Sequence, residues 1–296
     1  MIDTVIPSKE GISINLMKEH VKPFHVMPDR NNETMALGAV VGNTVTAPMT
    51  VTQEGPFQGQ NLICESDLFT TTGDHNFIVE MKMNSSDKPL MNRPVHGNTV
   101  FGSQSYPMVL PEWLYVSEHA SIQISVQNRV AVANDVRPMI GGRRFYPQAA
   151  NSSKLNNFLK QEKKRGIVSM PFFLTNKEET NITLAAGATN FFYFPADPDA
   201  WFDVYKIAGI AYDTVLGTPT GTYDFFIRDA ETGRRISTGL LSSQLAVGTG
   251  LQPYVFCESW LIPPKMEIEM EVTNTTAAGA NALEAFVTLI GRKIYV

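Results

Sequence analysis

The sequence predicts an all-β protein made of two tandem antiparallel β-sandwich, jelly-roll-like domains joined by a short helix. Three observations lead to this fold class: a chain of 296 residues rich in turn formers, with 21 Gly and 18 Pro, an internal repeat, and short runs in which apolar and polar residues alternate. At roughly 150 residues per domain, the length corresponds to two domains. Each half is long enough to fold without a metal or a disulfide.

The internal repeat is an ordered set of landmarks that occurs once in each half of the chain. Each copy contains a strand-like run, a Gly/Pro turn, a Trp-Leu pair, an alternating strand, an Asn and a closing Gly-Arg-Arg/Lys-aromatic segment. The first set is 76–80, Gly102, Pro107, Trp113 with Leu114, 122–126, Asn128 and 142–146. The second set is 224–228, Gly250, Pro253, Trp260 with Leu261, 266–272, Asn274 and 291–295. The shared order indicates two copies of one fold.

Strict alternation marks the clearest strand. One of its faces carries Met266, Ile268, Met270 and Val272, and the other carries Glu267, Glu269 and Glu271. Side chains alternate between the two faces of a strand, so this pattern indicates an antiparallel sheet with one solvated face. Many short strands of this kind, separated by turn residues, predict sandwiches.

The expected organisation has four parts: an N-terminal arm over 1–35, a first sandwich over 36–150, a helical linker over 151–166 and a second sandwich over 167–296. The arm has no clear periodicity, and we expect it to become ordered only against a neighbour. The linker helix is predicted from residue 154 to residue 165. Ser153 is its expected N-cap, and Gly166 is the expected left-handed residue at its end. Its Lys/Arg cluster suits the C-terminal end of the helix dipole and favours a solvated end over a nucleic-acid contact.

The charge content narrows the possible partners. Charged residues make up 18% of the chain, below the typical ~25%, which indicates a surface that other subunits cover. The net charge of −5 argues against nucleic acid as a partner. No apolar run approaches the ~18 residues of a membrane span, so no membrane partner is expected. Residues 1–9 lack the pattern of a signal peptide, and we expect synthesis in a reducing cytoplasm.

The cysteines and histidines show no ligand spacing. Cys64 and Cys257 are interpreted as free, buried thiols. The five histidines belong to no metal-binding motif. We interpret each as a turn or surface residue, and they are His20, His25, His75, His96 and His119.

The best metal candidates are Asp197, Asp199 and Asp203, whose carboxylates have loop spacing suited to calcium. Pro198 and the missing fourth acid argue against this, so we expect no metal and no cofactor. The stripe formed by Glu267, Glu269 and Glu271 has the spacing of an inverting glycosidase pair. A solvated strand face cannot raise the pKa of a general acid, however. We therefore expect no catalytic residues, no small-molecule substrate and no enzymatic activity.

An aromatic cluster is the predicted interface. It consists of Phe191, Phe192, Tyr193, Phe194, Trp201 and Phe202. An alternating strand buries only half of its residues, so the others are expected to form an exposed patch of the kind that marks interfaces. Trp113 and Trp260 occupy equivalent repeat positions, and both are interpreted as structural.

The repeated block resembles bacteriophage virion structural proteins with tandem β-sandwich domains. The closing segments, 288–295 and 139–146, carry most of the likeness. The resemblance implies a capsid-associated protein, either a minor, cement or vertex component or a major capsid component. Such a homo-oligomeric protein would assemble in the host cytoplasm, reside in the virion and dock on copies of itself and on other virion proteins. The alternative is a carbohydrate-binding or receptor-binding, adhesin-like β-sandwich of a phage tail or head–tail region.

Overall fold

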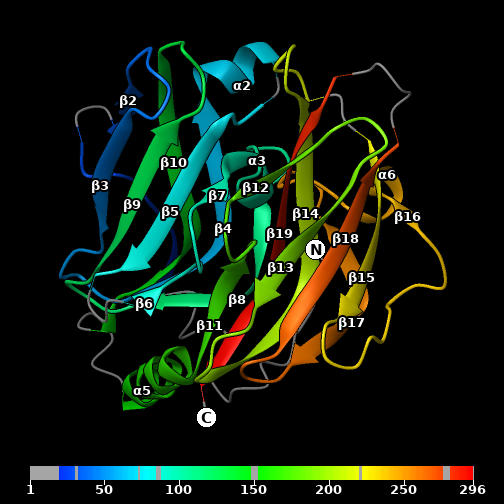
Figure 1. The fold of residues 1–296 in the computed structure, drawn as a ribbon. Coiled ribbons are helices and arrows are strands. Elements are labelled where there is room, and N and C mark those ends of the chain that lie inside the picture. Colours follow the sequence, from blue (N-terminus) through cyan, green and yellow to red (C-terminus); the bar gives the residue numbers. More distant parts are fainter. Residues whose placement is uncertain are drawn as a thin grey trace, which may run out of the picture.

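A computed structural model describes residues 20–30, 33–72, 74–84, 88–147, 153–219, 222–275 and 281–295. Within these ranges the chain forms four antiparallel sheets, two from each half, as the alternating runs predict (Figure 1). The predicted fold class, all-β with two tandem sandwiches, is confirmed. None of the helices in the described ranges has the length and hydropathy needed to cross a bilayer.

The first sandwich contains two sheets. One has the order β1 (Val21–Val26), β10 (Asn134–Phe145), β4 (Phe57–Ser66) and β8 (Met108–Val116), and β2 (Met35–Leu37) also pairs with β10. The other has the order β3 (Thr44–Thr50), β9 (Ser121–Asn128), β5 (Phe77–Met83) and β6 (Lys88–Pro89), and β7 (Val95–His96) also pairs with β5. The connections include α2 (Asp67–Thr72) and α3 (Gly97–Val100).

The second sandwich repeats this arrangement. One sheet has the order β11 (Ser169–Leu174), β19 (Leu283–Tyr295), β14 (Ala200–Asp213) and β17 (Tyr254–Ile262), and β12 (Asn181–Leu184) pairs with β19. The other has the order β13 (Thr189–Pro195), β18 (Glu267–Asn274), β15 (Tyr223–Asp229) and β16 (Leu241–Ser242), followed by α6 (Ser243–Ala246). If β1 with β2, β6 with β7 and β11 with β12 each count as one strand, both sandwiches have the eight-stranded jelly-roll order. The sequence repeat is thus a repeat of topology.

The closing Gly-Arg landmark has a steric cause. A Cβ on Gly142 would lie 2.0 Å from the Gln58 carbonyl oxygen, and a Cβ on Gly291 would lie 2.2 Å from the Asp203 carbonyl oxygen. The register of each strand pair is irregular beside this glycine. A β-bulge brings the two backbones so close together that only glycine fits.

The Asn landmarks hold equivalent turns. Asn128 ends β9 and donates its side-chain amide to the Gly38 carbonyl, and Asn274 ends β18 and donates its own to the Leu184 carbonyl. The two tryptophans are not equivalent, which corrects the sequence analysis. Trp260 pairs with Val204 and packs against the second core. Trp113 lies one register step away and meets the Arg143 guanidinium at 4.4 Å. One step places a side chain on the opposite face of a strand.

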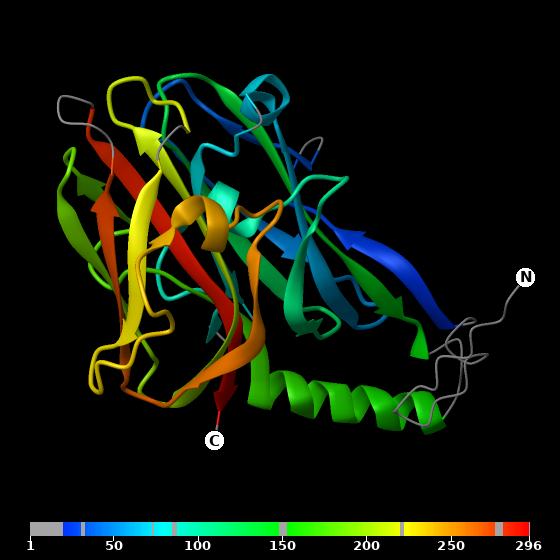
Figure 2. The same ribbon diagram turned by 90° about the vertical axis from the view of Figure 1, so that its right-hand side faces the viewer.

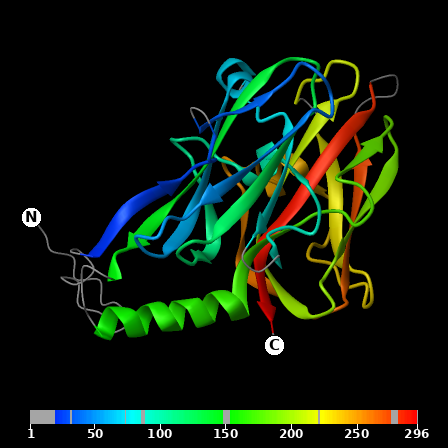
Figure 3. The same ribbon diagram turned by 90° about the vertical axis from the view of Figure 1, so that its left-hand side faces the viewer.

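The linker helix is longer than predicted. Helix α5 spans Ser153–Val168 and continues directly into β11 (Figure 3). Gly166 is therefore inside the helix and does not end it in a left-handed conformation. A Cβ at this position would lie 2.9 Å from the Tyr115 Cβ, so glycine permits close packing on β8. The apolar face of the helix is buried against Phe145, as the helical spacing of Leu155, Phe158 and Leu159 predicts.

The predicted N-terminal arm includes residues that belong to a sheet. Strand β1 pairs with β10 from Val21 to Val26, and β2 begins at Met35 and pairs with the same strand. These residues alternate too weakly for their sequence to reveal a strand, and β10 supplies their hydrogen bonds. Residues 1–19 of the arm lie outside the described residues. The division of the chain at 35, 150 and 166 stays a prediction.

The two sandwiches pack directly on each other. Met170, Phe173, Ala208 and Ile290 of the second sandwich belong to the buried apolar cluster of the first. Elements α3 and β8 of the first sandwich contact β14, β11 and β19 of the second. The outward faces of β14 and β19 are therefore covered by the first sandwich.

Candidate functional site

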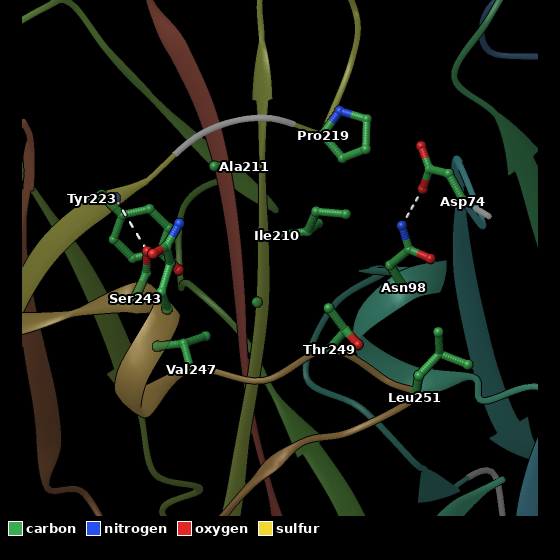
Figure 4. A pocket seen from close by; sticks show the side chains of 12 residues that line it. Asp74, Asn98, Ile210, Ala211, Pro219, Tyr223, Ser243, Val247, Thr249 and Leu251 are labelled. Atoms are coloured by element: carbon green, nitrogen blue, oxygen red, sulfur yellow. Dashed lines mark hydrogen bonds between the residues drawn. The ribbon is translucent and has the colours of Figure 1, made fainter. Parts of the chain in front are cut away.

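A cavity of about 300 Å³ lies where the two sandwiches meet (Figure 4). Asp74 and Asn98 reach it from the first sandwich, and Ile210 of β14, Tyr223 of β15 and Ser243 of α6 reach it from the second. Its lining mixes apolar side chains with a small number of hydrogen-bonding groups, which is the usual composition of a small-molecule site. It is the candidate site that the packing of the two sandwiches creates.

Asp74 is the acidic group of the cavity. Its carboxylate accepts hydrogen bonds from the Tyr212 hydroxyl at 2.6 Å and from the Asn98 side-chain amide. Burial raises the pKa of Asp74, while the two hydrogen bonds and the positive charge of Arg129 oppose the shift. Burial also raises the pKa of Tyr212, and the negative charge of Asp74 acts in the same direction. The Tyr212 hydroxyl therefore stays protonated and acts as a donor.

A charged pair lies behind the cavity wall and ties the sandwiches together. Arg129 of the first sandwich forms an ion pair with Glu284 of the second, and its guanidinium lies 4.4 Å from the centre of the Phe286 ring. His96 lies beside them and accepts a hydrogen bond from the Asn98 backbone. Burial lowers the pKa of His96, and the positive charge of Arg129 lowers it further, so the ring is neutral at pH 7.

Tyr223 carries a buried hydroxyl beside the cavity. The residue is 1% exposed, and among the residues described by the structure its hydroxyl has no hydrogen-bond partner. A Cβ at Gly209, which also lines the cavity, would lie 2.9 Å from this hydroxyl. A buried hydroxyl without a partner costs about 1–3 kcal/mol.

The predicted aromatic interface is split between core and surface. Phe192, Phe194 and Phe202 are fully buried in the second core. Phe191 and Tyr193 alternate with them on β13 and stack on each other with ring centres 6.2 Å apart. The interface role of the cluster stays a prediction. The buried members contribute to the core of the sandwich and have no surface to offer a partner.

The three aspartates proposed as metal candidates have separate partners. Asp197 pairs with Lys293, and Asp203 accepts hydrogen bonds from Arg292 at 3.1 Å and from the Tyr205 hydroxyl at 2.7 Å. The Asp199 backbone amide donates to Asp197. Within the described ranges, no group of three or more His, Cys, Asp or Glu side chains is placed to hold a metal ion.

Three residues depart from the sequence interpretation of histidines and thiols. His75 and His96 are 0% and 1% exposed, although turn or surface positions were expected. His75 stacks on Phe69 at 4.2 Å, and burial lowers its pKa to about 4, so it packs as a neutral aromatic ring. Both cysteines are free thiols as predicted, but only Cys64 is buried, and Cys257 is exposed on β17.

An exposed apolar surface lies on the second sandwich at α6 and β17. We call it the α6/β17 surface, and its members are Leu245, Tyr254, Val255 and Leu261. Figure 2 shows both elements on the side of the second sandwich that faces the viewer. Sequence reasoning missed these residues and the cavity residues alike. Alternation cannot show which apolar face lacks a cover, and Asp74 belongs to no motif.

Comparison with known proteins finds likeness only among solved structures. No family model matches the chain, and no curated protein matches it. The chain is similar to PNGase F, a glycosylasparaginase from Flavobacterium meningosepticum, at 8% identity and a TM-score of 0.40, covering 93% of this chain and 96% of that chain. It is similar to VP2 of an infectious bursal disease virus subviral particle at 11% identity and a TM-score of 0.26, covering 88% and 71%. Likeness at this level transfers neither activity nor assembly.

These comparisons correct one expectation and leave another open. From the sequence we expected a protein without enzymatic activity. That expectation is corrected, because solved structures of an enzyme, PNGase F, are among the matches. The likeness shows the fold alone and assigns no activity to this chain. Viral capsid proteins are also among the matches, but nothing in the comparisons points to a bacteriophage.

Proposed function

We propose that this chain is a capsid-associated structural protein of a bacteriophage virion, which acts by self-assembly and by docking on neighbouring subunits. It would serve as a minor, cement or vertex component or as a major capsid component. Its partners would be copies of itself and other virion proteins. Two packed jelly rolls provide a rigid block with wide faces, which suits a subunit that is surrounded by neighbours.

The observation that carries this proposal is the exposure of the α6/β17 surface. Leu245 is 79% exposed, Val255 58% and Leu261 50%. Large apolar side chains grouped on one face mark sites of association, whereas single ones are ordinary on a monomer. Burying such a surface against a neighbour removes apolar area from water, at roughly 25 cal/mol per Å².

The test is the mass of the full-length protein in solution as a function of concentration, measured by light scattering after size-exclusion chromatography. We expect oligomers, and we expect the double variant Leu245→Ser, Val255→Ser to dissociate them. The matched control is Val132→Ser, Val41→Ser, at exposed apolar positions on the first sandwich. A wild-type protein that stays monomeric at all concentrations would contradict the proposal. Detection of the chain in purified particles by mass spectrometry would assign it to a virion.

The second candidate function is carbohydrate binding, and the cavity between the sandwiches favours it. Its polar groups are one carboxyl, hydroxyls and amides, and the lining residues that the structure describes include no Lys or Arg. Such a lining suits a neutral molecule rich in hydroxyl groups better than an anion. The unpartnered Tyr223 hydroxyl is the observation in its support.

This second candidate is tested by glycan-array binding and saturation-transfer NMR with simple monosaccharides. We expect wild-type protein to give a signal that Tyr223→Phe abolishes, because only the hydroxyl is removed. Tyr193→Phe, on the outward face of β13, is the matched control and should keep the signal. An absence of any signal from wild-type protein would remove this candidate.

A further inference from the structure

The contact between the two sandwiches joins unlike surfaces. Helix α3 of the first sandwich lies on the outward face of β14 and β19 of the second. Thr99 of α3 shares a hydrogen bond of 2.8 Å with Thr288 of β19, and both residues are almost fully buried. Ala208 of β14 is covered by the same contact. A joint between unlike surfaces can repeat from one copy to the next.

We call α3 and β8 the donor half of this joint. Its equivalent in the second sandwich exposes large apolar side chains. Matching isolated bridges, Ile63 to Gly102 and Ala208 to Gly248, set the correspondence between the two sandwiches. By this register, α6 is the equivalent of α3, and Leu245 is the equivalent of Thr99. Thr99 is 0% exposed and Leu245 is 79% exposed.

We call the outward face of β14 and β19 the acceptor half of the joint. Its equivalent in the first sandwich lines an open groove. The equivalents of Ala208 and Thr288 are Ile63 of β4 and Met139 of β10, which pair with each other as Ala208 and Thr288 do. They line a groove of about 560 Å³ on the outward face of the first sandwich, whose other lining residues include Met27 and the charged residues Glu65 and Arg137. We call this face the β4/β10 groove.

The chemistry of the two uncovered halves matches. Within the chain, a threonine meets a threonine through a hydrogen bond. At the uncovered halves, a leucine stands where Thr99 would be and a methionine where Thr288 would be. Both positions are thus polar in the joint within the chain and apolar at the two uncovered halves. A contact between Leu245 and Met139 would remove apolar surface from water, which lowers the free energy of association. The flexible methionine side chain can adapt its shape to a partner.

A charged pair gives a second, independent match. Glu112 of β8 lies 3.6 Å from Arg292 of β19 across the joint within the chain. Their equivalents by strand register are Glu258 of β17, which is exposed, and Arg143 of β10. An acid and a base therefore stand again at corresponding positions, with the acid on the side of α6 and the base on the side of β10. Within the chain, Arg143 also donates a hydrogen bond to Gln58 at 2.9 Å and lies over Trp113.

We infer that the α6/β17 surface of one copy docks in the β4/β10 groove of a second copy of this chain, repeating between molecules the joint that links the sandwiches within one. This inference rests on the proposed self-assembly and names its partner surface. The contact joins unlike faces, so it leads to closed rings or to open filaments and not to a two-fold dimer through one shared patch.

Engineered disulfides test this arrangement on the full-length protein. In a Cys257→Ser background, which keeps the buried Cys64, the variant Leu245→Cys, Met139→Cys is oxidised mildly and run on non-reducing gels. We expect covalent multimers that disappear on reduction. Thr99→Cys, Thr288→Cys is the positive control and should form its bond within one chain, without a change in mass on the gel. Leu245→Cys, Val132→Cys is the negative control.

The outcomes separate this inference from the proposed function. Cross-linked multimers well above the level of the Val132 control support the inference. Oligomers in light scattering without the expected cross-link overturn the inference and leave self-assembly standing through another face. A protein that stays monomeric overturns both. A charge exchange adds a further measurement: Glu258→Arg should weaken association, and Arg143→Glu in the same chain should restore part of it.

Discussion

The two sandwiches have the same strand order but different surroundings at equivalent edges. In the first sandwich, α3 and β8 face the second sandwich, and Thr99, Val100 and Leu110 are buried. In the second sandwich, α6 and β17 occupy the same topological place. Their side chains Leu245, Val255 and Leu261 are exposed, while Ser243 of α6 is buried at the cavity between the sandwiches. At Thr99, which is 0% exposed, and its equivalent Leu245, which is 79% exposed, the difference shows that burial follows from the neighbour and not from the fold of the sandwich itself. It is the reason why Thr99 belongs to a buried contact and Leu245 is an exposed apolar side chain.

The largest expected effect tests what the sandwiches share. Gly142→Ala and Gly291→Ala each place a Cβ about 2 Å from a backbone carbonyl oxygen at the bulge. We expect each to lower the free energy of unfolding by about 3 kcal/mol, because overpacking against backbone cannot be relieved by a side-chain rotation. Urea denaturation measures the loss, and Gly239→Ala, which has open space around its Cβ, is the control. A loss at only one of the two glycines would show that the bulges are not equivalent.

An intermediate effect is expected where the sandwiches differ. Thr99→Val removes a buried hydroxyl that bonds both Thr288 and the His96 carbonyl, and should cost about 1–3 kcal/mol. Leu245→Ala at the equivalent exposed position should change the stability of the monomer by less than about 0.5 kcal/mol. Both are measured by denaturation at a protein concentration where association is absent. Equal losses would mean that α6 is as well packed as α3.

The smallest effects concern pH and have opposite signs in two aspartates. Burial raises the pKa of Asp74 above its ordinary value of 3.8, so the folded state holds its proton more tightly than the unfolded state. Its contribution to stability is fully present below pH 3.8 and is lost as the pH rises through the folded pKa. The isosteric Asp74→Asn variant should therefore gain stability relative to wild type as the pH rises from 3 to 7.

Asp197 provides the matched comparison in the second sandwich. Its pKa is lowered: burial would raise it, but the contacts with Lys293 and the Asp199 amide outweigh burial. Its contribution is present above pH 3.8 and is lost as the pH falls through the folded pKa. Asp197→Asn should therefore be less stable than wild type at pH 7, with a difference that closes at low pH. The same trend for both aspartates would contradict the role assigned to burial at Asp74.

Much of the fold was predictable because it depends on local pattern. The alternation of Met266, Ile268, Met270 and Val272 with glutamates specifies which face of β18 is buried, and the structure buries it. The Asn landmarks at 128 and 274 helped to predict two copies of one fold, and in the structure they hold equivalent turns. The prediction that Gly166 ends the helix was wrong. A glycine can end a helix or permit close packing, and the sequence does not show that Tyr115 lies against this position.

The candidate site was not predictable, because its parts come from distant segments. Asn98 and Tyr212 are 114 residues apart in the sequence and form a hydrogen bond only because the two sandwiches pack together. The same packing brings Asp74 and Tyr223 to one cavity. Nothing local distinguishes Tyr223 from any other buried strand aromatic.

The sequence by itself determined two copies of one jelly roll, their alternating faces and the glycines of their bulges, because these depend on neighbours along a strand or across one strand pair. Only the tertiary structure decided that Thr99 is covered while its equivalent Leu245 is exposed. It also decided that a polar cavity forms between the sandwiches and that Trp113 and Trp260 face opposite sides of their sheets. Each of these depends on which surface comes to lie against another, and a single chain pattern does not encode that relation locally.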